Sequence, residues 1–382
     1  MKTKTLAALR APRRAEVAAA VADNGIDVEI LDPREGQDPS GWAKFRKLAA
    51  PQPMWDYGLL RLEAWLSRNP PVLAVMREGG RVLGACVVML CDPVRGSVFA
   101  PGPSARGSRL APRWAEVYLP WFSGHPAVVF RERVDADSRR ELLRIFERRL
   151  AEYAGPGLLG VIYRAMPSDI AELVAGRGRA RREIDPTTVL HNRFDSVDDW
   201  VESLRAPVRA VVRDALGRLD SLDVTTGKGR KDLDAAKLAT LLNEHRARQD
   251  ARAWRSGQRA RIAGLHLDTR SPIPTAYLAE FLRRPTVLTR TYREPSGRLV
   301  AFQAMFDTEY GLAMPYWAAL PRQQGGRPRL HLDGYAHAVR ELIDSGRPEL
   351  TAGRTLLDLK ADLGFTTRTL HSIAVPRPVM GR

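Results

Sequence analysis

Lys360 is the residue whose type and position most suggest chemistry. It is the only lysine after position 237, in a chain that otherwise uses arginine for its positive charges. A lysine ammonium is a compact point charge, which suits a single developing negative charge better than a planar guanidinium does. The alternative is a solvated helical lysine paired with Asp358 or Asp362. We treat Lys360 as a candidate catalytic residue.

Two further catalytic candidates precede Lys360. Tyr316, beside Trp317 on a predicted strand, could hydrogen-bond a reaction intermediate or protonate a leaving group, although a tyrosine packed in the core is the alternative. Asp307 ends a predicted hairpin and, like Glu309, could orient an amine substrate. Asp92 stands at the corresponding point of an earlier hairpin, which favours a structural turn role instead.

Arginines gather in two segments that could bind phosphate. Residues 245–261 contain six arginines and one aspartate, and residues 176–182 contain four arginines and no acid. A guanidinium donates two hydrogen bonds to phosphate at once, and an aromatic ring between arginines could stack on a base. The candidates in the first segment are Arg248, Arg252, Trp254, Arg255 and Arg259. A merely solvated surface is the alternative for both segments.

Four more phosphate-binding candidates lie closer to Lys360. They flank a predicted strand, loop and helix or the turn before Lys360, and they are Arg322, Arg327, His331 and Arg354. An exposed basic turn and a helix-capping histidine are the alternatives.

The net charge of +16 and the pI near 10.4 point to a phosphate-bearing partner. Only eight of the 60 basic residues are lysine, as GC-biased coding would produce. Such a bias replaces lysine by arginine, but it does not explain a surplus over 44 acidic residues. A solvated surface without a polyanionic partner remains the alternative.

Several classes of protein are excluded or disfavoured. His331 and His337 are poorly spaced for a shared metal, and no Ser-His-Asp or Cys-His arrangement is readable, so we expect no metal site. Cys86 and Cys91 lie in one predicted buried strand and give no disulfide framework. The longest apolar run, 82–91, is about half of the ~20 residues that a spanning helix needs. With no signal peptide either, we expect a cytoplasmic protein.

The elements that position these candidates occur twice. Residues 62–92 and 278–307 each read as a helix with a late aromatic residue and an arginine, a proline, and two apolar runs around an Arg-Glu turn. The copies lie 216 residues apart, from Arg68 to Arg284, which is far beyond the period of a solenoid repeat. The repeat predicts two similar domains.

The chain of 382 residues is long enough for two such domains, each able to bury a core. We place an N-terminal arm at 1–53, a first domain at 54–194 and a second at 195–382. Alternating helices and strands predict a mixed α/β sheet in each domain. A helix at 138–153 carries a clear apolar stripe, and a helix at 198–219 contains Pro207, where it could bend.

The order of elements in each copy resembles the GNAT acyltransferase fold. Both copies read as helix, hairpin, long strand, loop, helix, strand, short helix and final strand. The loop PRQQGGRPR (321–329) stands where GNAT enzymes place their pyrophosphate-binding loop, and KADLGF (360–365) resembles their closing segment. A duplicated GNAT fold is most similar to the Fem-type and FemAB-like aminoacyltransferases, over roughly residues 54–375.

The same loop departs from the pattern of GNAT enzymes that use acetyl-CoA. Their motif, Arg/Gln-x-x-Gly-x-Gly/Ala, turns backbone N–H groups toward the pyrophosphate. Here Arg322 and Gly325 fit, but Arg327 stands where the small residue belongs. A reading one residue later ends on Pro328, which has no N–H. This departure counts against CoA without excluding it.

The resemblance to Fem-type enzymes implies a tRNA-dependent aminoacyltransferase. Such enzymes need no CoA: they move an aminoacyl group from a charged tRNA to an amine of a peptidoglycan precursor or a small metabolite, and form an amide. It also implies that Lys360 contacts phosphate or the developing oxyanion, and that Tyr316 lies where the acyl group binds. No cofactor besides the aminoacyl-tRNA co-substrate is implied.

Two rival interpretations remain open. One is an acyl-CoA-dependent N-acyltransferase, and the other is a non-catalytic RNA-binding protein on a GNAT scaffold. The sequence does not identify the amino acid, the tRNA, the acceptor amine or the oligomeric state.

Overall fold

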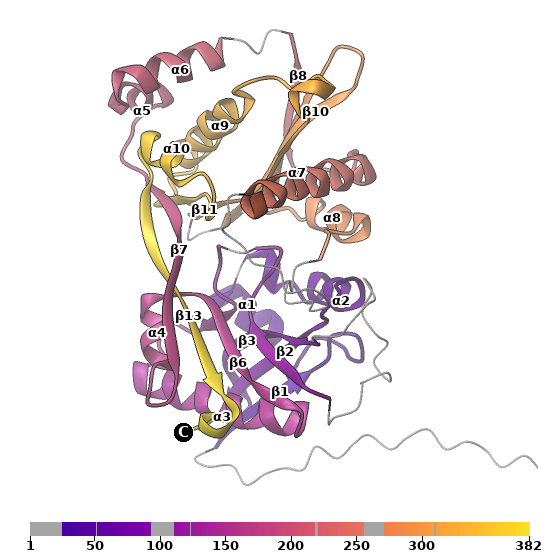
Figure 1. Ribbon diagram of the computed structural model, residues 1–382, viewed down its shortest axis with the longest axis vertical. Helices are drawn as coiled ribbons and strands as arrows, with labels where there is room; N and C mark the ends of the chain where they lie inside the picture. Colours follow the sequence, from indigo (N-terminus) through magenta and orange to yellow (C-terminus); the bar gives the residue numbers. More distant parts are fainter. Residues whose placement is uncertain are drawn as a thin grey trace, which may run out of the picture.

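The structure, a computed structural model, describes most of the chain (Figure 1). The described residues are 25–50, 52–92, 111–122, 124–217, 221–255, 271–308 and 311–382, without the side chains of 252–255. The helix predicted near 13–23 and most of the loop predicted at 100–113 lie outside them.

The first half of the molecule, residues 25–194, contains every element predicted there. Its strands are β1 (Ile26–Leu31), β2 (Pro71–Glu78), β3 (Arg81–Cys91), β4 (Arg113–Val117), β5 (Val128–Phe130), β6 (Leu158–Pro167) and β7 (Ala180–His191). Its helices are α1 (Trp42–Ala49), η1 (Pro53–Trp55), α2 (Tyr57–Leu66), α3 (Ala136–Ala154) and α4 (Ser168–Val174). The predicted apolar stripe of α3 is buried, because Leu142, Phe146 and Leu150 pack into the core.

The second half, residues 195–382, repeats this order. Its strands are β8 (Asp223–Lys228), β9 (Val287–Arg293), β10 (Leu299–Thr308), β11 (Gly311–Ala319), β12 (Glu349–Thr351) and β13 (Thr366–Pro376). Its helices are α5 (Val197–Ser203), α6 (Ala206–Leu216), α7 (Ala235–Arg255), α8 (Thr275–Leu282), η2 (Arg322–Gln324), α9 (Leu330–Asp344), α10 (Leu357–Asp362) and η3 (Arg377–Val379). The predicted helix at 198–219 is two helices, because Pro207 cannot continue a helix from the preceding turn and stands at the start of α6.

The two repeated segments form the same unit, a helix followed by a hairpin. The tight turn between β2 and β3 is made by Gly79 and Gly80, whose φ angles of +52° and +79° are both left-handed. Two consecutive left-handed residues match the twist of a hairpin, and glycine adopts them without strain. The repeated helices α2 and α8 pack against each other, so the repeat meets itself across the two halves.

The described strands form one continuous sheet in which the halves exchange their last strands. The order is β1-β2-β3-β4-β6-β13-β7-β12-β11-β10-β9-β8, with β5 paired to β3. β13 of the second half pairs with β6, and β7 of the first half pairs with β12. Figure 1 shows β7 and β13 running side by side along the molecule and joining its two ends.

The apolar core also crosses between the halves. Trp121 and Phe122, which follow β4, pack with Tyr277, Phe281 and other side chains of the second half in one buried cluster. The sheet and the core are therefore shared, and the domain boundary placed between residues 194 and 195 stays a prediction.

No helix in the described ranges is both long and apolar enough to cross a membrane.

Candidate active site

The parallel strands β11 and β12 pair over a short stretch only, and the place where this pairing ends is called the opening below. They pair only at Leu312 with Leu350 and at Ala313 with Thr351. The ladder between β10 and β11 also shifts register directly after this point, between Ala313 and Tyr316. Pro315 lies inside this irregularity and has no N–H to donate to a ladder, which explains why the register shifts here. In the first half, β4 and β6 stay paired as far as Val117 with Tyr163.

A loop from the first half lies against both arms of this opening. On the β11 arm, the ring of Phe122 stacks on Tyr316 with centroids 5.8 Å apart. Toward the β12 arm, Gly124 lies so close to Gly353 that a Cβ added to it would be 3.4 Å from the Gly353 Cα. His125 follows in the same loop and packs on Phe306, with ring centroids 5.4 Å apart. Residues of both halves thus meet where β11 leaves β12.

Three buried polar atoms around this opening have no hydrogen-bond partner among the described residues. They are the Tyr316 hydroxyl, Oε1 of Glu63 and Oγ1 of Thr187, in side chains that are 2–3% exposed. Thr187 Oγ1 lies at the loop, since a Cβ on Gly124 would be 3.3 Å from it. Buried polar groups are nearly always hydrogen-bonded, so several unpaired ones in one region indicate groups that act on a ligand or bind water.

Burial sets the protonation of two of these groups. Burial raises the pKa of the Glu63 carboxyl to about 8. Burial also raises the pKa of Tyr316 well above its ordinary value, and the charge of Glu63 adds to this while Arg246 opposes it. Tyr316 is therefore a neutral phenol that can donate a hydrogen bond, and Glu63 exchanges its proton near the working pH of an enzyme.

The raised pKa of Glu63 predicts a pH-dependent stability. The ordinary pKa of this carboxyl is 4.5, so between pH 4.5 and about 8 the folded state binds more protons than the unfolded state. Stability contributed by Glu63 is thus complete below pH 4.5 and falls as the pH rises toward 8, by about 1.4 kcal/mol per pKa unit of difference. We expect Glu63→Gln to have a higher Tm than the wild type at pH 9 and a flatter dependence of Tm on pH. Calorimetry from pH 5 to 9 checks this, with Glu280→Gln on α8 as the control; parallel curves for wild type and Glu63→Gln would contradict it.

Lys360 is buried and engaged with the backbone rather than presented to solvent. It is 1% exposed, and its Nζ donates to the carbonyl oxygens of Ala352 and, at 3.3 Å, of Gly353. Burial lowers the pKa of its ammonium to about 8. The alternative considered for Lys360, an ion pair with Asp358 or Asp362, is absent from the described contacts, and Asp362 pairs with Arg205. Lys360 fixes the turn at 352–353, which is the β12 arm of the opening.

Asp307 is held in two ion pairs. It accepts hydrogen bonds from Arg347 Nε at 2.8 Å and from Lys228 Nζ at 2.9 Å. Burial alone would raise the pKa of Asp307, but these two bonds outweigh it and lower the pKa. The carboxylate ties β10 to β8 and to the end of α9, so its geometry is that of a structural ion pair rather than of a group that orients an amine. Glu309 lies outside the described residues.

The predicted phosphate loop after β11 is tightly wound on itself. The N–H groups of Gln324 and Gly326 both donate to the Pro321 carbonyl, and the N–H of Gly325 donates to that of Arg322. A Cβ on Gly326 would lie 1.9 Å from the Leu320 carbonyl oxygen, so only glycine fits there. Three N–H groups that could have bound a pyrophosphate therefore donate hydrogen bonds within the turn instead.

The basic side chains near this loop are arranged unevenly. Arg322 and Arg327 are exposed, whereas His331 is half-buried on α9 and burial lowers its pKa. Arg354 donates through Nε to the Asp185 carbonyl on β7, at 2.9 Å. The structure thus leaves the two loop arginines facing solvent and uses Arg354 to fix its own turn.

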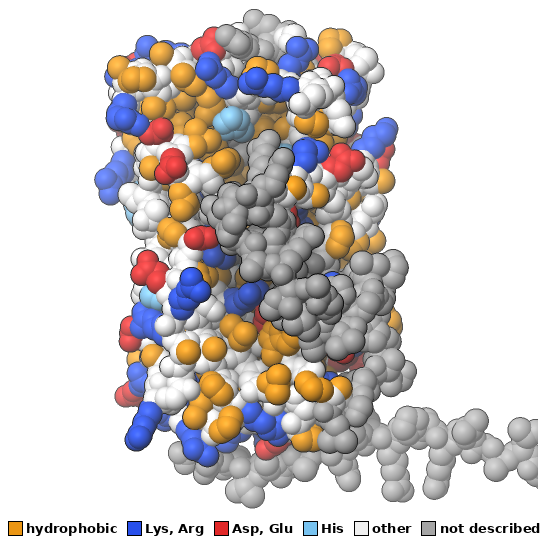
Figure 2. All heavy atoms as spheres, in the orientation of Figure 1, with side chains coloured by type: hydrophobic (Ala, Val, Ile, Leu, Met, Phe, Trp, Pro, Cys, Tyr) orange, Lys and Arg blue, Asp and Glu red, His pale blue; other side chains and the backbone are white. Residues whose placement is uncertain are grey.

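The predicted arginine-rich segment is only partly described. Arg248 donates to the Ala319 carbonyl at 2.7 Å and so fastens α7 to the end of β11. Arg252, Trp254 and Arg255 belong to α7, but their side chains are outside the described residues, as is Arg259 entirely. Figure 2 shows basic side chains spread over one face and interspersed with acidic ones. No group of three potential metal ligands occurs among the described residues.

Sequence reasoning did not identify Glu63 or His125. Glu63 had a readable signal, because it follows Leu59 by four positions and Leu60 by three, which places a carboxyl on the buried stripe of α2. The second copy of the repeat has Ala279 at the matching position. His125 lies in a loop with no periodic pattern; burial, followed by the charge of Arg368, lowers the pKa of its ring to about 4. Its imidazole is therefore neutral at pH 7.

Comparison with solved structures shows the same fold. L-PGS from Bacillus licheniformis is 10% identical, with 92% of this chain and 98% of that chain covered and a TM-score of 0.54. The C-terminal domain (DUF2156) of a putative lysylphosphatidylglycerol synthetase from Agrobacterium fabrum is 12% identical, with 87% and 90% covered and a TM-score of 0.50. No family model and no curated protein matches the sequence. The chain therefore has the mixed α/β fold that its sequence predicts, and it shares its overall fold with these two proteins.

Proposed function

We propose that this protein is a tRNA-dependent aminoacyltransferase that forms an amide on a small or peptide-like amine. The observation that carries the proposal is that the Tyr316 hydroxyl, near where β11 leaves β12, and Oε1 of Glu63, whose charge acts on Tyr316, are both buried and without a hydrogen-bond partner among the described residues. Acyl transfer needs a positioned amine, a group to take its proton and a donor for the carbonyl oxygen. These two side chains supply the second and third requirements.

The proposed step balances as follows. The amine nitrogen attacks the ester carbonyl carbon of the aminoacyl-tRNA, and its proton passes to the Glu63 carboxylate. The Tyr316 hydroxyl donates a hydrogen bond to the carbonyl oxygen as negative charge develops there. The bond from the carbonyl carbon to the ribose oxygen then breaks, and that oxygen takes up the proton held by Glu63. Lys360 is a positioning residue that holds the turn at 352–353 beside the reacting groups.

Two observations favour a charged tRNA over acyl-CoA as the donor. In the loop after β11, three backbone N–H groups already donate hydrogen bonds within the loop itself, so they do not bind a pyrophosphate as they would in an enzyme that uses CoA. The surplus of basic residues and the exposed Arg322 and Arg327 suit a polyanion held by its backbone phosphates. The shared fold with a putative lysylphosphatidylglycerol synthetase, whose name describes joining lysine to another molecule, supports aminoacyl transfer. A cytoplasmic location, where charged tRNA is abundant, follows from the proposal.

Binding distinguishes the donors before any acceptor is known. We expect tRNA to raise the Tm of the protein and to bind with an affinity that falls steeply as salt increases, since phosphate contacts release counterions. Acetyl-CoA is expected to leave the Tm unchanged. Differential scanning fluorimetry and fluorescence anisotropy from about 50 to 200 mM salt measure both. Protection by acetyl-CoA, together with indifference to tRNA at low salt, would refute the proposal in favour of a CoA-dependent enzyme.

A further inference from the structure

A cavity lined by arginines lies on the first half, away from β11 and α10. It has a volume of about 570 Å³ and is bounded by α3, by the turn between α4 and β7, and by the last residues of the chain. Five arginines and no acidic residue line it, and they are Arg140, Arg144, Arg177, Arg179 and Arg382. Figure 1 places α3, α4 and the C-terminal residues together at the lower end of the molecule. The cavity includes part of the basic segment 176–182, which the proposed aminoacyl transfer does not use.

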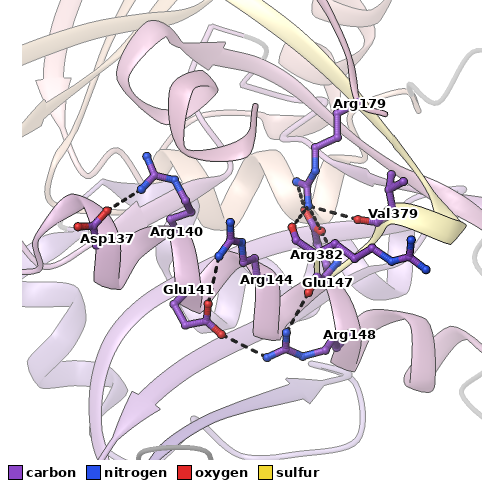
Figure 3. Close-up of polar contacts among 10 residues, drawn as sticks. Asp137, Arg140, Glu141, Arg144, Glu147, Arg148, Arg179, Val379 and Arg382 are labelled. Atoms are coloured by element: carbon purple, nitrogen blue, oxygen red, sulfur yellow. Dashed lines mark hydrogen bonds and ion pairs between the residues drawn. The ribbon is translucent and has the colours of Figure 1, made fainter. Parts of the chain in front are cut away.

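One of the five arginines is part of the wall. Arg179 is almost fully buried and donates to both carboxylate oxygens of Glu147 at 2.8 Å (Figure 3). Glu147 also accepts from the Tyr163 hydroxyl and from the N–H of Gly381. This buried carboxylate joins α3, β6, the turn before β7 and the chain end, so the cavity has a fixed frame.

The other four arginines are available to an anion. Arg140 pairs with Asp137, whose side chain is 95% exposed, and Arg144 lies 3.6 Å from the half-exposed Glu141 (Figure 3). Exposed pairs of this kind contribute little and exchange readily. No carboxylate of the described residues pairs with Arg177 or with Arg382. The last main-chain oxygen of Arg382 also accepts a hydrogen bond from Arg179, at 3.2 Å. The described side chains still leave the charges of Arg177 and Arg382 without a carboxylate partner, so the cavity has a surplus of positive charge.

The backbone supports the position of Arg177. The residue stands between Gly176 and Gly178, and Gly178 has a left-handed φ of +77°. A Cβ on Gly178 would lie 3.0 Å from Val379 Cγ1, so glycine allows the turn to approach the chain end closely. Leu143, Leu173 and Val379 add an apolar surface beside the charges.

We propose that this cavity binds the phosphate group of a small phosphorylated molecule. Guanidinium groups recognise phosphate through paired hydrogen bonds, and several of them here face one space. The cavity volume lies within the range of small-molecule sites, and the apolar wall suits the non-phosphate part of such a ligand. An RNA phosphate shares the chemistry, but an RNA strand needs an extended groove that follows its backbone, whereas this cavity is compact. This site is separate from the proposed reacting centre and does not depend on it.

Binding of phosphate probes to the full-length protein tests the site. Isothermal titration at low salt would use inorganic pyrophosphate, a 5′-mononucleotide and a short single-stranded RNA. We expect both small probes to bind the wild type. The double variant Arg144→Ala/Arg177→Ala should weaken that binding by about tenfold or more, since each of its two substitutions removes a charge-assisted hydrogen bond. Arg182→Ala removes the same type of charge from the same segment, outside the cavity, and is expected to change binding less than about twofold.

Three results would overturn the assignment. They are no binding of either small probe at low salt, equal weakening by Arg182→Ala and by the double variant, or arginine-dependent binding of RNA without binding of the small probes. Circular dichroism confirms that the double variant is folded. Because the probes contain no aminoacyl group, failure here leaves the proposed aminoacyl transfer unaffected, and failure of that proposal leaves this site unaffected.

Discussion

Replacing Glu63 with glutamine is expected to lower the rate of amide formation by about a hundredfold or more. Glutamine keeps the shape of the side chain but cannot take a proton from the attacking amine, and general-base catalysis is typically worth ~10²–10⁴. Tyr316→Phe is expected to cost about 10² to 10³, because it removes one donor to the carbonyl oxygen. Hydroxamate released from charged tRNA with hydroxylamine as a stand-in amine measures both rates.

Two comparisons test whether the loss of rate is specific to Glu63: a glutamate on the matching helix, and the dependence of the rate on pH. Glu280→Gln changes a half-buried glutamate on the matching helix α8, where it pairs with Arg283, and should leave the rate near that of the wild type. The wild-type rate should rise with pH up to about 8, as Glu63 loses its proton, whereas Glu63→Gln should lack this rise. A Glu63→Gln variant with a wild-type rate and pH profile would remove Glu63 from the mechanism.

Separating the two halves is expected to abolish folding of each half. β13 lies between β6 and β7, and β7 lies between β13 and β12, so each half alone loses a strand from the middle of the sheet. The exposed edges would also invite aggregation. We expect residues 25–194 and 195–382, expressed separately, to lack a cooperative thermal transition, because the loss exceeds the ~5–15 kcal/mol by which a domain is stable.

Coexpression of the two fragments tests whether the exchanged strands restore folding when both halves are present. The two fragments together should form a stoichiometric complex that melts cooperatively, whereas removing 366–376 from the second fragment should prevent it. Circular dichroism and size-exclusion chromatography measure both outcomes. A cooperative transition in residues 195–382 alone would show that the second half folds without β7.

The elements were predictable because their patterns are local. The apolar stripe of α3, the Gly79-Gly80 turn and the break at Pro207 each follow from neighbouring residues. The exchange of β7 and β13 could not be predicted from the sequence, because each strand could equally have paired with strands of its own half. Which strand lies beside which is decided by the tertiary structure rather than by the sequence of the strand.

For the candidate site, the sequence predicted the strand that carries Tyr316, but not the burial of Lys360 or the contribution of Glu63. Tyr316 lies on the strand that was predicted for it, β11, next to the place where this strand leaves β12, and its role at an acyl group stays a prediction. The burial of Lys360 was not readable, since six residues of a short helix carry no periodic pattern that shows which face is covered. Glu63 belongs to the first half, and its charge acts on Tyr316 of the second half because α2 packs against α8. Contacts between the halves therefore decide the site.

The transfer reaction itself tests the central claim most directly. Purified protein would be mixed with a pool of radiolabelled aminoacyl-tRNAs and hydroxylamine, and in parallel with acetyl-CoA and hydroxylamine. Our account predicts protein-dependent hydroxamate from at least one aminoacyl-tRNA, lost in Glu63→Gln and Tyr316→Phe, and none from acetyl-CoA. Protein-dependent hydroxamate from acetyl-CoA and from no aminoacyl-tRNA would contradict this prediction. So would protein-dependent hydroxamate from charged tRNA at the wild-type rate in both variants.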